Sequence, residues 1–452
     1  MWTLAQACAA AGGRLLDADA SFTSVGTDSR RDCTGQLFVA LRGERFDGHE
    51  YLAKARERGA TAALVDHAVE LDLPQCVTGD TRLGLGRLAG AWRDRFPGRV
   101  AAITGSNGKT TVKEMLAAIL SQVGQTRATQ GNLNNDIGMP LTLLAARDES
   151  FLVLEMGANH PGEIAYMTAI GRPEVALITN AGRAHLEGFG SVAGVARAKG
   201  EIVQGLPAGG IFVVPGDSPF TPLWRDLAGA RSVLTFALDT PAELAAESGS
   251  VRVDWGAEGF RTRFTARHQG REHPLELRLA GTHNVRNALA AAAAALAMGV
   301  GMDAVRSGLL SLAPVPGRLC PLRCNGVRVI DDTYNANPDS IAAAVSVLVG
   351  LPGRRWLVLG DLGELGGESR ALHREVGARA REAGVSRLTT VGAQSAEASA
   401  AFGEGARHFD DQERLAAYLR ESLGADDVAL VKGSRAARME GIVRTLCGRG
   451  DD

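Results

Sequence analysis

The sequence predicts an α/β protein with three domains, and three observations support this prediction. The chain has 452 residues, a length that corresponds to about three domains of average size. From residue 99 onward, apolar strand-like runs alternate with helical patterns, which is typical of mostly parallel sheets covered by helices. The segment APVPGR, at residues 313–318, interrupts this alternation and is suited to a hinge. We therefore divide the chain into residues 1–95, 96–313 and 314–452.

Each domain has its own pattern of predicted strands and helices. In the first, short strand-like runs such as QLFVALRG surround a helical segment, which predicts a small α/β domain. In the central domain, the strand-like runs RVAAITG, SFLVLEMG and EVALITNAG each precede a predicted helix, so a mostly parallel sheet is expected. VRVDWGAEGFRTRFTAR and LELRLAG then alternate polar and apolar residues, which predicts a small antiparallel sheet. The last domain repeats the strand–helix pattern and is expected to be an open, Rossmann-like α/β domain.

Composition and charge exclude several classes of function. The formal net charge of -2 gives no electrostatic footprint for nucleic acid or for an anionic membrane. The most apolar run, NALAAAAAALAMGV, is shorter than a membrane span and alanine-rich, so a packed helix is expected. The first residues lack a basic leader, which favours a cytoplasmic protein. The six cysteines are scattered without zinc-ligand spacing, and we expect reduced thiols.

The segment TGSNGKTT, residues 104–111, lies between a predicted strand and a predicted helix and is typical of a phosphate-binding loop. Gly105 and Gly108 would let backbone N–H groups turn toward phosphates at a helix N-terminus. Lys109 would reach the terminal phosphates, and Thr110 could hold Mg²⁺. The loop is shorter than the standard one, and a simple glycine turn is the alternative. The pattern nevertheless predicts a central domain of the P-loop ATPase type.

Two further polar residues follow predicted strands of the same sheet. Glu155 ends the run LVLEMG, and His185 lies just after EVALITNAG. Strand ends in open α/β sheets face the ligand crevice, so both could ligate Mg²⁺ or lie close to it. A structural role is the alternative for each. The sequence has no nucleophile elbow, which favours phosphoryl transfer, a chemistry of positioning and charge stabilisation.

Lysine is rare in this chain, because only five of its 49 basic residues are lysines and the others are arginines. A position that keeps lysine under such a bias is a candidate for a role that needs an amine, since a guanidinium cannot act as a point charge or a nucleophile. Lys109, Lys199 and Lys432 lie inside the motifs described next.

Nine segments occur in an order that resembles the Mur ligases. They are GSNGKTT, GNLNNDIGMP, LEMGANHPGEI, NAGRAHLEGFGS, AKGEI, GTHNVRNALAA, DDTYNANPDS, GDLGELG and VKGSRAARME. Near the start, DSRRDCTGQLFVALRGERFDGHEY is similar to that family's uridine-nucleotide-binding domain. The resemblance spans the whole chain and implies an ATP-dependent, amide-forming ligase.

Within the family, GNLNNDIG, DDTYNANPDS and KGSRAARME resemble the member that adds a dipeptide. This resemblance implies transfer of D-alanyl-D-alanine to UDP-N-acetylmuramoyl-tripeptide through an acyl phosphate, giving the pentapeptide precursor of peptidoglycan. It also implies ATP and two Mg²⁺ ions. We expect a monomer, although the sequence does not determine the oligomeric state, and charge and hydropathy predict no nucleic acid and no membrane insertion. The third residue of the tripeptide, lysine or diaminopimelate, stays open, as does the base that accepts the proton of the incoming amine.

The resemblance also implies a role for individual residues. Catalysis would depend on Lys109, Glu155, His185 and a carbamylated Lys199, with Thr110, Glu155, His185 and Lys199 at the metals. ATP would be bound by Gly105, Ser106, Asn107, Gly108, Lys109, Thr110, Thr111, Asn284, Asn287, Arg318 and Asp332. The uridine nucleotide would contact Ser29, Arg30, Asp47 and His49, and the muramoyl-peptide Asn134 and Asn135. The dipeptide side would be lined by Asn335, Asn337, Asp361, Lys432, Ser434 and Arg435.

Three alternatives stay open. The first is a related ligase that uses another amino acid or a folate-like acceptor, which the nucleotide-binding pattern near the start disfavours. The second is a P-loop NTPase that acts as a switch or motor and forms no bond. The third is a non-catalytic nucleotide-binding module, and the set Glu155, His185 and Lys199 argues against it.

Overall fold

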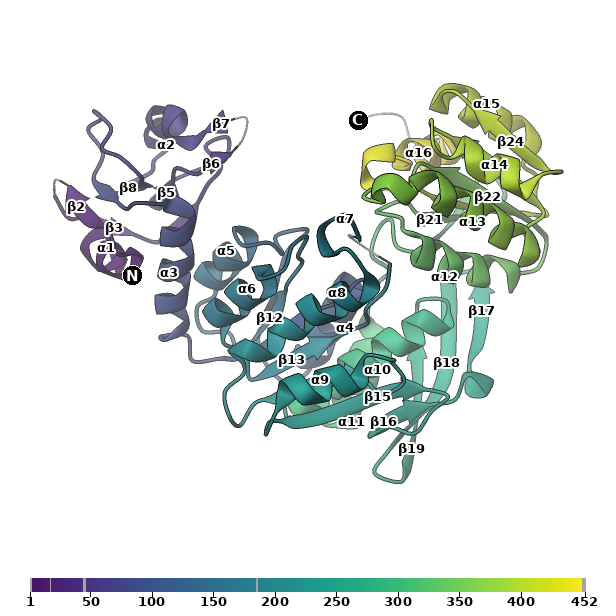
Figure 1. Ribbon diagram of the computed structural model, residues 1–452, viewed down its shortest axis with the longest axis horizontal. Coiled ribbons are helices and arrows are strands. Elements are labelled where there is room, and N and C mark those ends of the chain that lie inside the picture. The colour runs from purple at the N-terminus through teal and green to yellow at the C-terminus, as the bar shows by residue number, and fades with distance from the viewer. Residues whose placement is uncertain (1, 17, 44–45, 184–185, 449–452) are drawn as a thin grey trace.

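A computed structural model describes residues 2–16, 18–43, 46–183 and 186–448. The chain forms an N-terminal unit (β1 to α3), a central unit (β10 to α11) and a C-terminal unit (β20 to α16). In Figure 1 the central unit lies between the other two, which flank it at opposite ends. This α/β architecture with mostly parallel sheets is the predicted fold class.

The N-terminal unit is a small α/β structure whose main sheet has the strand order β2-β9-β8-β5-β4. All of its pairings are parallel except that of β2 with β9. Asp80 caps α3 by accepting hydrogen bonds from the backbone amides of Arg82 and Leu83, and α3 then leads into the central unit. The elements are β1 (Trp2–Thr3), α1 (Leu4–Ala11), β2 (Arg14–Leu16), β3 (Ser21–Phe22), β4 (Ser24–Gly26), β5 (Gln36–Val39), β6 (Arg42–Gly43), β7 (Phe46–Asp47), α2 (Leu52–Glu57), β8 (Ala62–Val65), β9 (Gln75–Val77) and α3 (Thr81–Arg93).

The central unit contains a long sheet in the order β11-β12-β10-β13-β14-β15-β16-β18-β17, with β19 paired to β18. The strands from β11 to β16 are parallel, and β17, β18 and β19 are antiparallel. The predicted antiparallel sheet therefore continues the parallel one. The strands are β10 (Arg99–Thr104), β11 (Thr126–Ala128), β12 (Phe151–Glu155), β13 (Val175–Ile178), β14 (Ile211–Pro215), β15 (Ser232–Leu238), β16 (Leu244–Ala246), β17 (Arg252–Gly256), β18 (Gly259–His268) and β19 (Arg271–Leu277).

Helices cover the parallel part of this sheet, as the strand–helix alternation predicts. The alanine-rich run identified in the sequence lies within α10 except for its last three residues, and it is buried in the core next to α4, so it is a packed helix. No helix among the described residues is long and apolar enough to cross a membrane. The helices are α4 (Lys109–Leu120), α5 (Gly138–Ala145), α6 (Glu163–Gly171), α7 (Leu186–Phe189), α8 (Val192–Gly200), α9 (Thr221–Ala228), α10 (Thr282–Ala297) and α11 (Met302–Ser311).

The C-terminal unit is an open α/β sheet in the order β20-β21-β25-β22-β23-β24. Only the edge pairing of β20 with β21 is antiparallel among the described strands of this sheet. Its elements are β20 (Cys320–Cys324), β21 (Val327–Asp332), α12 (Pro338–Val349), β22 (Arg354–Gly360), α13 (Ser369–Glu382), β23 (Arg387–Val391), α14 (Ala396–Phe402), β24 (Ala406–Phe409), α15 (Gln412–Ser422), β25 (Asp427–Lys432) and α16 (Glu440–Cys447).

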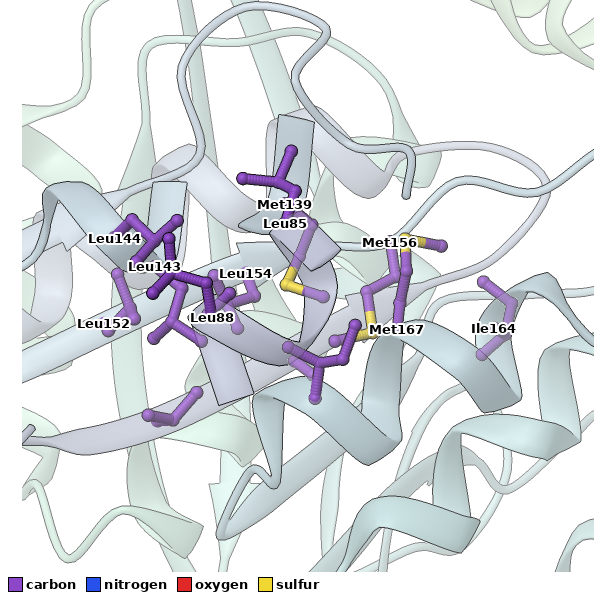
Figure 2. Packing of buried hydrophobic residues seen from close by; sticks show 14 of the residues in the cluster. Leu85, Leu88, Met139, Leu143, Leu144, Leu152, Leu154, Met156, Ile164 and Met167 are labelled. Atoms are coloured by element: carbon purple, nitrogen blue, oxygen red, sulfur yellow. The ribbon is translucent and has the colours of Figure 1, made fainter. Parts of the chain in front are cut away.

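The hydrophobic cores join the units unequally. One apolar cluster runs from the N-terminal unit into the central unit and includes α3, α5, α6 and β12. Figure 2 shows part of this cluster, with Leu85 and Leu88 of α3 against Leu143, Leu154 and Met167. The C-terminal unit has its own clusters, which take in only a few central residues such as Phe260 and Ala280.

The expectation of reduced cysteines is wrong for four of the six. Cys8 is paired with Cys76, with 5.5 Å between their Cα atoms, and Cys324 with Cys447, with 4.3 Å. Cys33 and Cys320 are free thiols. The sequence could not predict the pairs because 68 and 123 residues separate the partners, which only the fold brings together.

Candidate functional site

The predicted phosphate loop connects β10 to α4 at the carboxyl end of the sheet. Gly105 has φ of 146° and Gly108 has φ of 81°, conformations that strongly favour glycine. A Cβ atom at Gly105 would collide with Thr179, and one at Gly108 would lie 2.5 Å from Asn287 Oδ1. Both glycines are therefore required by conformation and by close packing, and the loop N–H groups lie at the start of α4.

The amine of Lys109 is folded over this loop. Its Nζ donates hydrogen bonds to Gly105 O at 2.7 Å and to Ser106 O at 3.3 Å. Burial lowers the pKa of Lys109, although the nearby Glu155 carboxylate opposes that shift. The cation thus lies where phosphate oxygens would approach the loop.

Glu155 ends β12, which pairs in parallel with β10, so its carboxylate lies beside the phosphate loop. Oε1 accepts hydrogen bonds from Thr110 Oγ1 at 3.3 Å and from Asn134 Nδ2 at 2.8 Å. Oε2 is buried and has no hydrogen-bond partner among the described residues. A hydroxyl next to a carboxylate oxygen with unused lone pairs is a donor set that fits Mg²⁺.

The loop after β13 is fastened to the phosphate loop, a connection that sequence reasoning did not find. Thr179 Oγ1 donates to Asn107 O at 2.7 Å, and Asn180 Oδ1 accepts from Asn107 N at 3.0 Å. Gly182 N donates to Ser106 Oγ at 2.9 Å. The motif NAGRAHLEGFGS drew attention to this segment, but only for His185, which lies outside the described residues.

The start of α10 forms another wall. Asn284 Nδ2 donates to Ala280 O at 2.8 Å, and Asn287 Nδ2 donates to Asn284 Oδ1 at 3.1 Å, so the two amides order one another. His283 was not predicted but lines the same wall. Burial, together with the charge of Lys432, lowers the pKa of His283 to about 4. This imidazole is therefore neutral near pH 7.

The C-terminal unit closes over the loop from the opposite side. Arg318 donates from its guanidinium to Thr110 Oγ1 at 3.0 Å and stacks on Tyr334, with 4.1 Å between its Cζ and the ring centre. Its Nε is buried and unpartnered within the described part of the chain. Arginine is suited to planar phosphate recognition, so this position fits the predicted phosphate contact.

A buried ion pair joins two strand ends of the C-terminal unit. Lys432 Nζ donates to Asp332 Oδ2 at 2.7 Å and to Asn335 O at 2.8 Å. Burial raises the pKa of Asp332, while Lys432 works in the opposite direction. The amine thus fixes the loop that carries Asn335 and Asn337, and Asn337 Nδ2 donates to Asn107 Oδ1 at 2.8 Å.

A cavity of about 1470 Å³ lies between the central and C-terminal units, and residues of α3 and its neighbours reach its rim. The structure brings most of the predicted site residues into its wall. These are Ser106, Asn107, Gly108, Lys109, Thr110, Thr111, Asn134, Asn135, Glu155, Asn284, Asn287, Arg318, Asp332, Asn335, Asn337, Lys432, Ser434 and Arg435.

Lys199 does not line this cavity but lies directly behind its wall. It belongs to α8, is 1 % exposed, and its Nζ lies 3.4 Å from Ala158 O and 5.2 Å from the ring centre of Phe189. Burial and the charge of Lys109 lower the pKa of Lys199 to about 7. A large fraction of this amine is therefore uncharged at neutral pH.

Asp361 also lies outside the cavity wall. Its Oδ1 accepts hydrogen bonds from the backbone amides of Gln394 and Ser395, at 3.1 and 2.7 Å. These contacts order the loop after β23. Its predicted place on the dipeptide side stays a prediction.

The residues predicted for uridine-nucleotide binding are in the N-terminal unit, away from the cavity wall. Arg30 donates to Asp28 at 2.8 Å, and the neighbouring Ser29 is buried. Asp47 Oδ1 accepts from both the backbone and the ring of His49, at 2.9 and 2.6 Å. Asp47 and the buried His49 therefore stabilise a turn, and their contact with substrate stays a prediction.

His49, Asp66 and His67 form a group that could in principle hold a metal ion. The Arg42 guanidinium, however, lies 3.1 Å from Asp66 Oδ2 and 3.0 Å from Asp47 Oδ2. The Arg42 guanidinium therefore already neutralises these two carboxylates, and the group is an ion-pair network.

Comparison with family models matches almost the whole chain. The model of the Mur ligase family catalytic domain matches residues 21–119, that of the Mur ligase middle domain residues 103–295, and that of the Mur ligase glutamate ligase domain residues 317–435. The chain therefore belongs to the Mur ligase family and is a ligase.

Individual relatives sharpen this assignment. The UDP-N-acetylmuramoyl-tripeptide–D-alanyl-D-alanine ligase of Escherichia coli is 47 % identical over 98 % of both chains. A crystal structure of MurF from Acinetobacter baumannii is 35 % identical, covers 99 % of both chains and has a TM-score of 0.92. MurF from Thermotoga maritima in complex with ADP is 29 % identical, covers 94 % of this chain and 97 % of its own, and has a TM-score of 0.84.

Proposed function

We propose that this chain joins D-alanyl-D-alanine to UDP-N-acetylmuramoyl-tripeptide at the expense of ATP, as the name of its Escherichia coli relative states for that protein. The observation that carries the proposal is the cavity in which the phosphate loop of the central unit faces Arg318, Asn335 and Lys432 of the C-terminal unit. Such a wall offers one side to a nucleotide and the other to a second substrate.

The reaction begins when the tripeptide's terminal carboxylate attacks the γ-phosphoryl group and forms an acyl phosphate. Charge develops on phosphate oxygens in this step, and the loop N–H groups, Lys109 and Arg318 are placed to stabilise it. The dipeptide amine then attacks the acyl carbon and phosphate leaves. Asn335, Asn337, Ser434 and Arg435 line the side of the cavity from which we infer that the dipeptide enters.

Mg²⁺, when bound, supplies positive charge that offsets the negative charge of the phosphates. Thr110 and Glu155 would hold one ion, because the hydroxyl contacts Oε1 of a carboxylate whose other oxygen, Oε2, has no partner among the described residues. His185 keeps its predicted metal role as part of the proposal.

Lys199 is proposed to become carbamylated. An uncharged amine can react with carbon dioxide to give an anionic oxygen ligand, whereas a guanidinium stays protonated. The burial of Lys199 and its pKa of about 7 favour the uncharged form. The carbamate would lie next to Ala158, directly behind the cavity wall, and would supply oxygen ligands to a second Mg²⁺.

Further parts of the proposal concern the whole chain. We infer a cytoplasmic monomer whose three domains span residues 1–95, 96–313 and 314–452. The first domain would bind the uridine nucleotide through Ser29, Arg30, Asp47 and His49, and Asn134 with Asn135 would position the muramoyl-peptide.

The decisive experiment is an ADP-release assay with UDP-N-acetylmuramoyl-tripeptide, with and without D-alanyl-D-alanine. ADP release that requires the dipeptide, with formation of the pentapeptide by mass spectrometry, supports the proposal. ATP hydrolysis that ignores the dipeptide indicates an NTPase that forms no bond. A Lys109→Ala variant serves as the control, and its turnover should fall below a tenth of the wild-type rate.

The carbamate is tested separately with Lys199→Arg, which keeps a long basic side chain but removes the reactive amine. Turnover should fall about 100-fold or more, as for other losses of a charge-stabilising group. Lys199→Ala should be similarly inactive and partly rescued by a small carboxylate. Near-normal turnover of Lys199→Arg, or a wild type insensitive to bicarbonate depletion at alkaline pH, would show that no carbamate is needed.

A further inference from the structure

Arg183 belongs to the loop after β13 and has no part in the proposed chemistry, yet it makes the most extensive polar contact between the central and C-terminal units that the described residues contain. The loop emerges from the sheet next to the phosphate loop, and Arg183 contacts Asp339 in the first turn of α12 and Glu375 in the second turn of α13.

The contacts of Arg183 are bidentate on two carboxylates. Its Nε and one terminal nitrogen donate to Asp339 Oδ1 at 3.0 Å each, and its backbone N donates to Asp339 Oδ2 at 2.8 Å. The other terminal nitrogen donates to both oxygens of Glu375, at 2.8 and 3.0 Å. One side chain thus holds two helices of the C-terminal unit.

The other end of the same loop is fixed to the phosphate loop. Asn180 and Gly182 bond to Asn107 and Ser106, as described above. Asn337 Nδ2 reaches Asn107 directly from the C-terminal unit at 2.8 Å. The chain from Ser106 through Gly182 and Arg183 to Asp339 is therefore continuous, and each link is a hydrogen bond or one peptide unit.

An incidental surface ion pair would differ from this arrangement in two ways. Exposed pairs are usually single and contribute little, whereas the three side chains here are 25 %, 35 % and 28 % exposed and share a forked geometry. In addition, the backbone is adapted to the contact, because a Cβ atom at Gly182 would lie 2.8 Å from Asp339 Oδ2. Both features indicate that this is a specific contact between the two units and not an incidental surface ion pair.

We propose that Arg183 is a positioning residue that clamps the C-terminal unit against the phosphate loop through Asp339 and Glu375. The clamp sets the fraction of molecules in which the C-terminal unit faces the phosphate loop, and so the fraction able to accept the second substrate. The apparent affinity for a ligand that needs the closed arrangement falls in proportion to that fraction. This inference rests on the proposed function only for its kinetic consequence, because the clamp itself is a contact between units.

The test compares Arg183→Ala and Asp339→Asn with Arg379→Ala. Arg379 is a matched control, since it also pairs with Glu375, at 2.8 Å, but from within α13. For both clamp variants we expect kcat/KM for D-alanyl-D-alanine to fall about 10-fold, while the Kd for ADP changes by less than about threefold. Arg183→Lys should recover little, because an ammonium cannot fork between two carboxylates.

Small-angle X-ray scattering of the ligand-free proteins provides a readout that needs no activity. Both clamp variants should have a larger radius of gyration than the wild type, and Arg379→Ala should not. Radii and kinetics of the clamp variants that match the control would overturn the proposal. Should the wild type release no ADP with the dipeptide, the proposed function fails, yet the scattering still decides the clamp. Using two clamp variants, one on each side, guards against a folding defect in either.

Discussion

The central unit has two interfaces, one with each neighbouring unit, and they differ in their chemistry. We call them the first and the second joint. At the first joint, α3 of the N-terminal unit lies on α5 and α6 of the central unit, and Leu85 and Leu88 belong to an apolar cluster shared by both (Figure 2). At the second joint, the central and C-terminal units meet through side-chain hydrogen bonds of Asn107, Thr110 and Arg183.

The second joint also has a small apolar contact away from the cavity. Phe260 of β18 packs with the C-terminal cluster, and a Cβ atom at Gly281 would lie 2.8 Å from Val347 of α12. This contact and the segment 313–318 lie where the two units would pivot. A polar clamp at one side and a small pivot at the other make a joint that can open.

The difference follows from the physics of the contacts. Separating an apolar joint exposes its area to water at about 25 cal/mol per Å², a cost with no compensation. Separating a polar joint exchanges protein hydrogen bonds for water ones, so each costs only about 1 kcal/mol net. We infer that the first joint is permanent and the second is the one that moves during the reaction.

The largest expected effect is that of Leu88→Ala at the apolar joint. Leu88 is 1 % exposed, and truncating it removes packing and leaves a cavity, so the free energy of unfolding should fall by about 3 kcal/mol. Denaturant unfolding of the full chain measures this. Leu83→Ala on the same helix is the control, because Leu83 is 44 % exposed and should change stability by less than about 0.5 kcal/mol. Equal effects for the two leucines would contradict a permanent apolar joint.

The next largest effect is a pH dependence of stability caused by Lys199. This residue lies at the edge of the shared apolar cluster, which includes Phe189 and Ala198. The pKa of Lys199 is about 7 in the folded chain and about 10.4 in an unfolded one, so the unfolded state holds its proton longer. Stability must therefore rise with pH across this window. Between pH 6 and pH 8, without bicarbonate, the gain should be about 1.4 kcal/mol.

Unfolding of the wild type and of Lys199→Met at pH 6 and pH 8 isolates this contribution. The stability of the wild type relative to Lys199→Met should fall by about 1.4 kcal/mol from pH 8 to pH 6, because only the wild type has an amine that becomes charged there. A pH dependence that is identical in both would show that the Lys199 amine keeps an ordinary pKa.

A smaller effect is expected from ionic strength, which should act on the polar joint alone. Raising salt from 0.1 to 1 M shortens the Debye length from about 10 to 3 Å and weakens the partly exposed pairs of Arg183. The ligand-free radius of gyration should increase in the wild type and stay constant in Arg183→Ala, in which the clamp is already absent. A salt effect of the same size in both proteins would place the sensitive contacts elsewhere.

Local patterns in the sequence predict the fold class and the phosphate loop, whereas most of the cavity wall was predicted only through the resemblance to the Mur ligases. Strand–helix alternation predicts the parallel sheets, and the glycines around Lys109 predict the phosphate loop that β10 and α4 form. The relation between distant segments leaves no local signal. The pairing of Cys8 with Cys76 and the contact of Arg183 with Asp339 both join residues far apart in the chain.

The same reasoning explains why His283 and Asn180 were missed. Each lies inside a motif that the sequence identifies. Their roles depend on surroundings that residue type does not reveal, because His283 is buried and neutral and Asn180 binds the phosphate loop. His49 illustrates the converse, since its side chain stabilises a turn, whereas its binding role was implied by the family resemblance alone.

The smallest effect is expected for Arg82→Gln, which removes a polar contact from the apolar joint. Arg82 of α3 donates to both oxygens of Asp136, with 2.7 Å between one terminal nitrogen and Oδ1, so this pair crosses the first joint as Arg183 crosses the second. Arg82 is 54 % exposed, however, and Leu85 and Leu88 already hold α3 in place beneath it. An exposed pair on a joint that is closed by other means should contribute no more than about 0.5 kcal/mol.

Arg82→Gln should therefore leave the radius of gyration unchanged and lower the free energy of unfolding by that small amount. Because Arg82 also lines the cavity rim, the comparison uses unfolding and scattering and avoids kinetics. The double variant with Leu88→Ala sharpens the test. Once the apolar contact is weakened, the ion pair should contribute more, so the double variant should lose more stability than the sum of the two single variants. A loss above about 1.5 kcal/mol for Arg82→Gln alone would mean that the first joint also depends on its charges, and the contrast between the two joints would be one of degree.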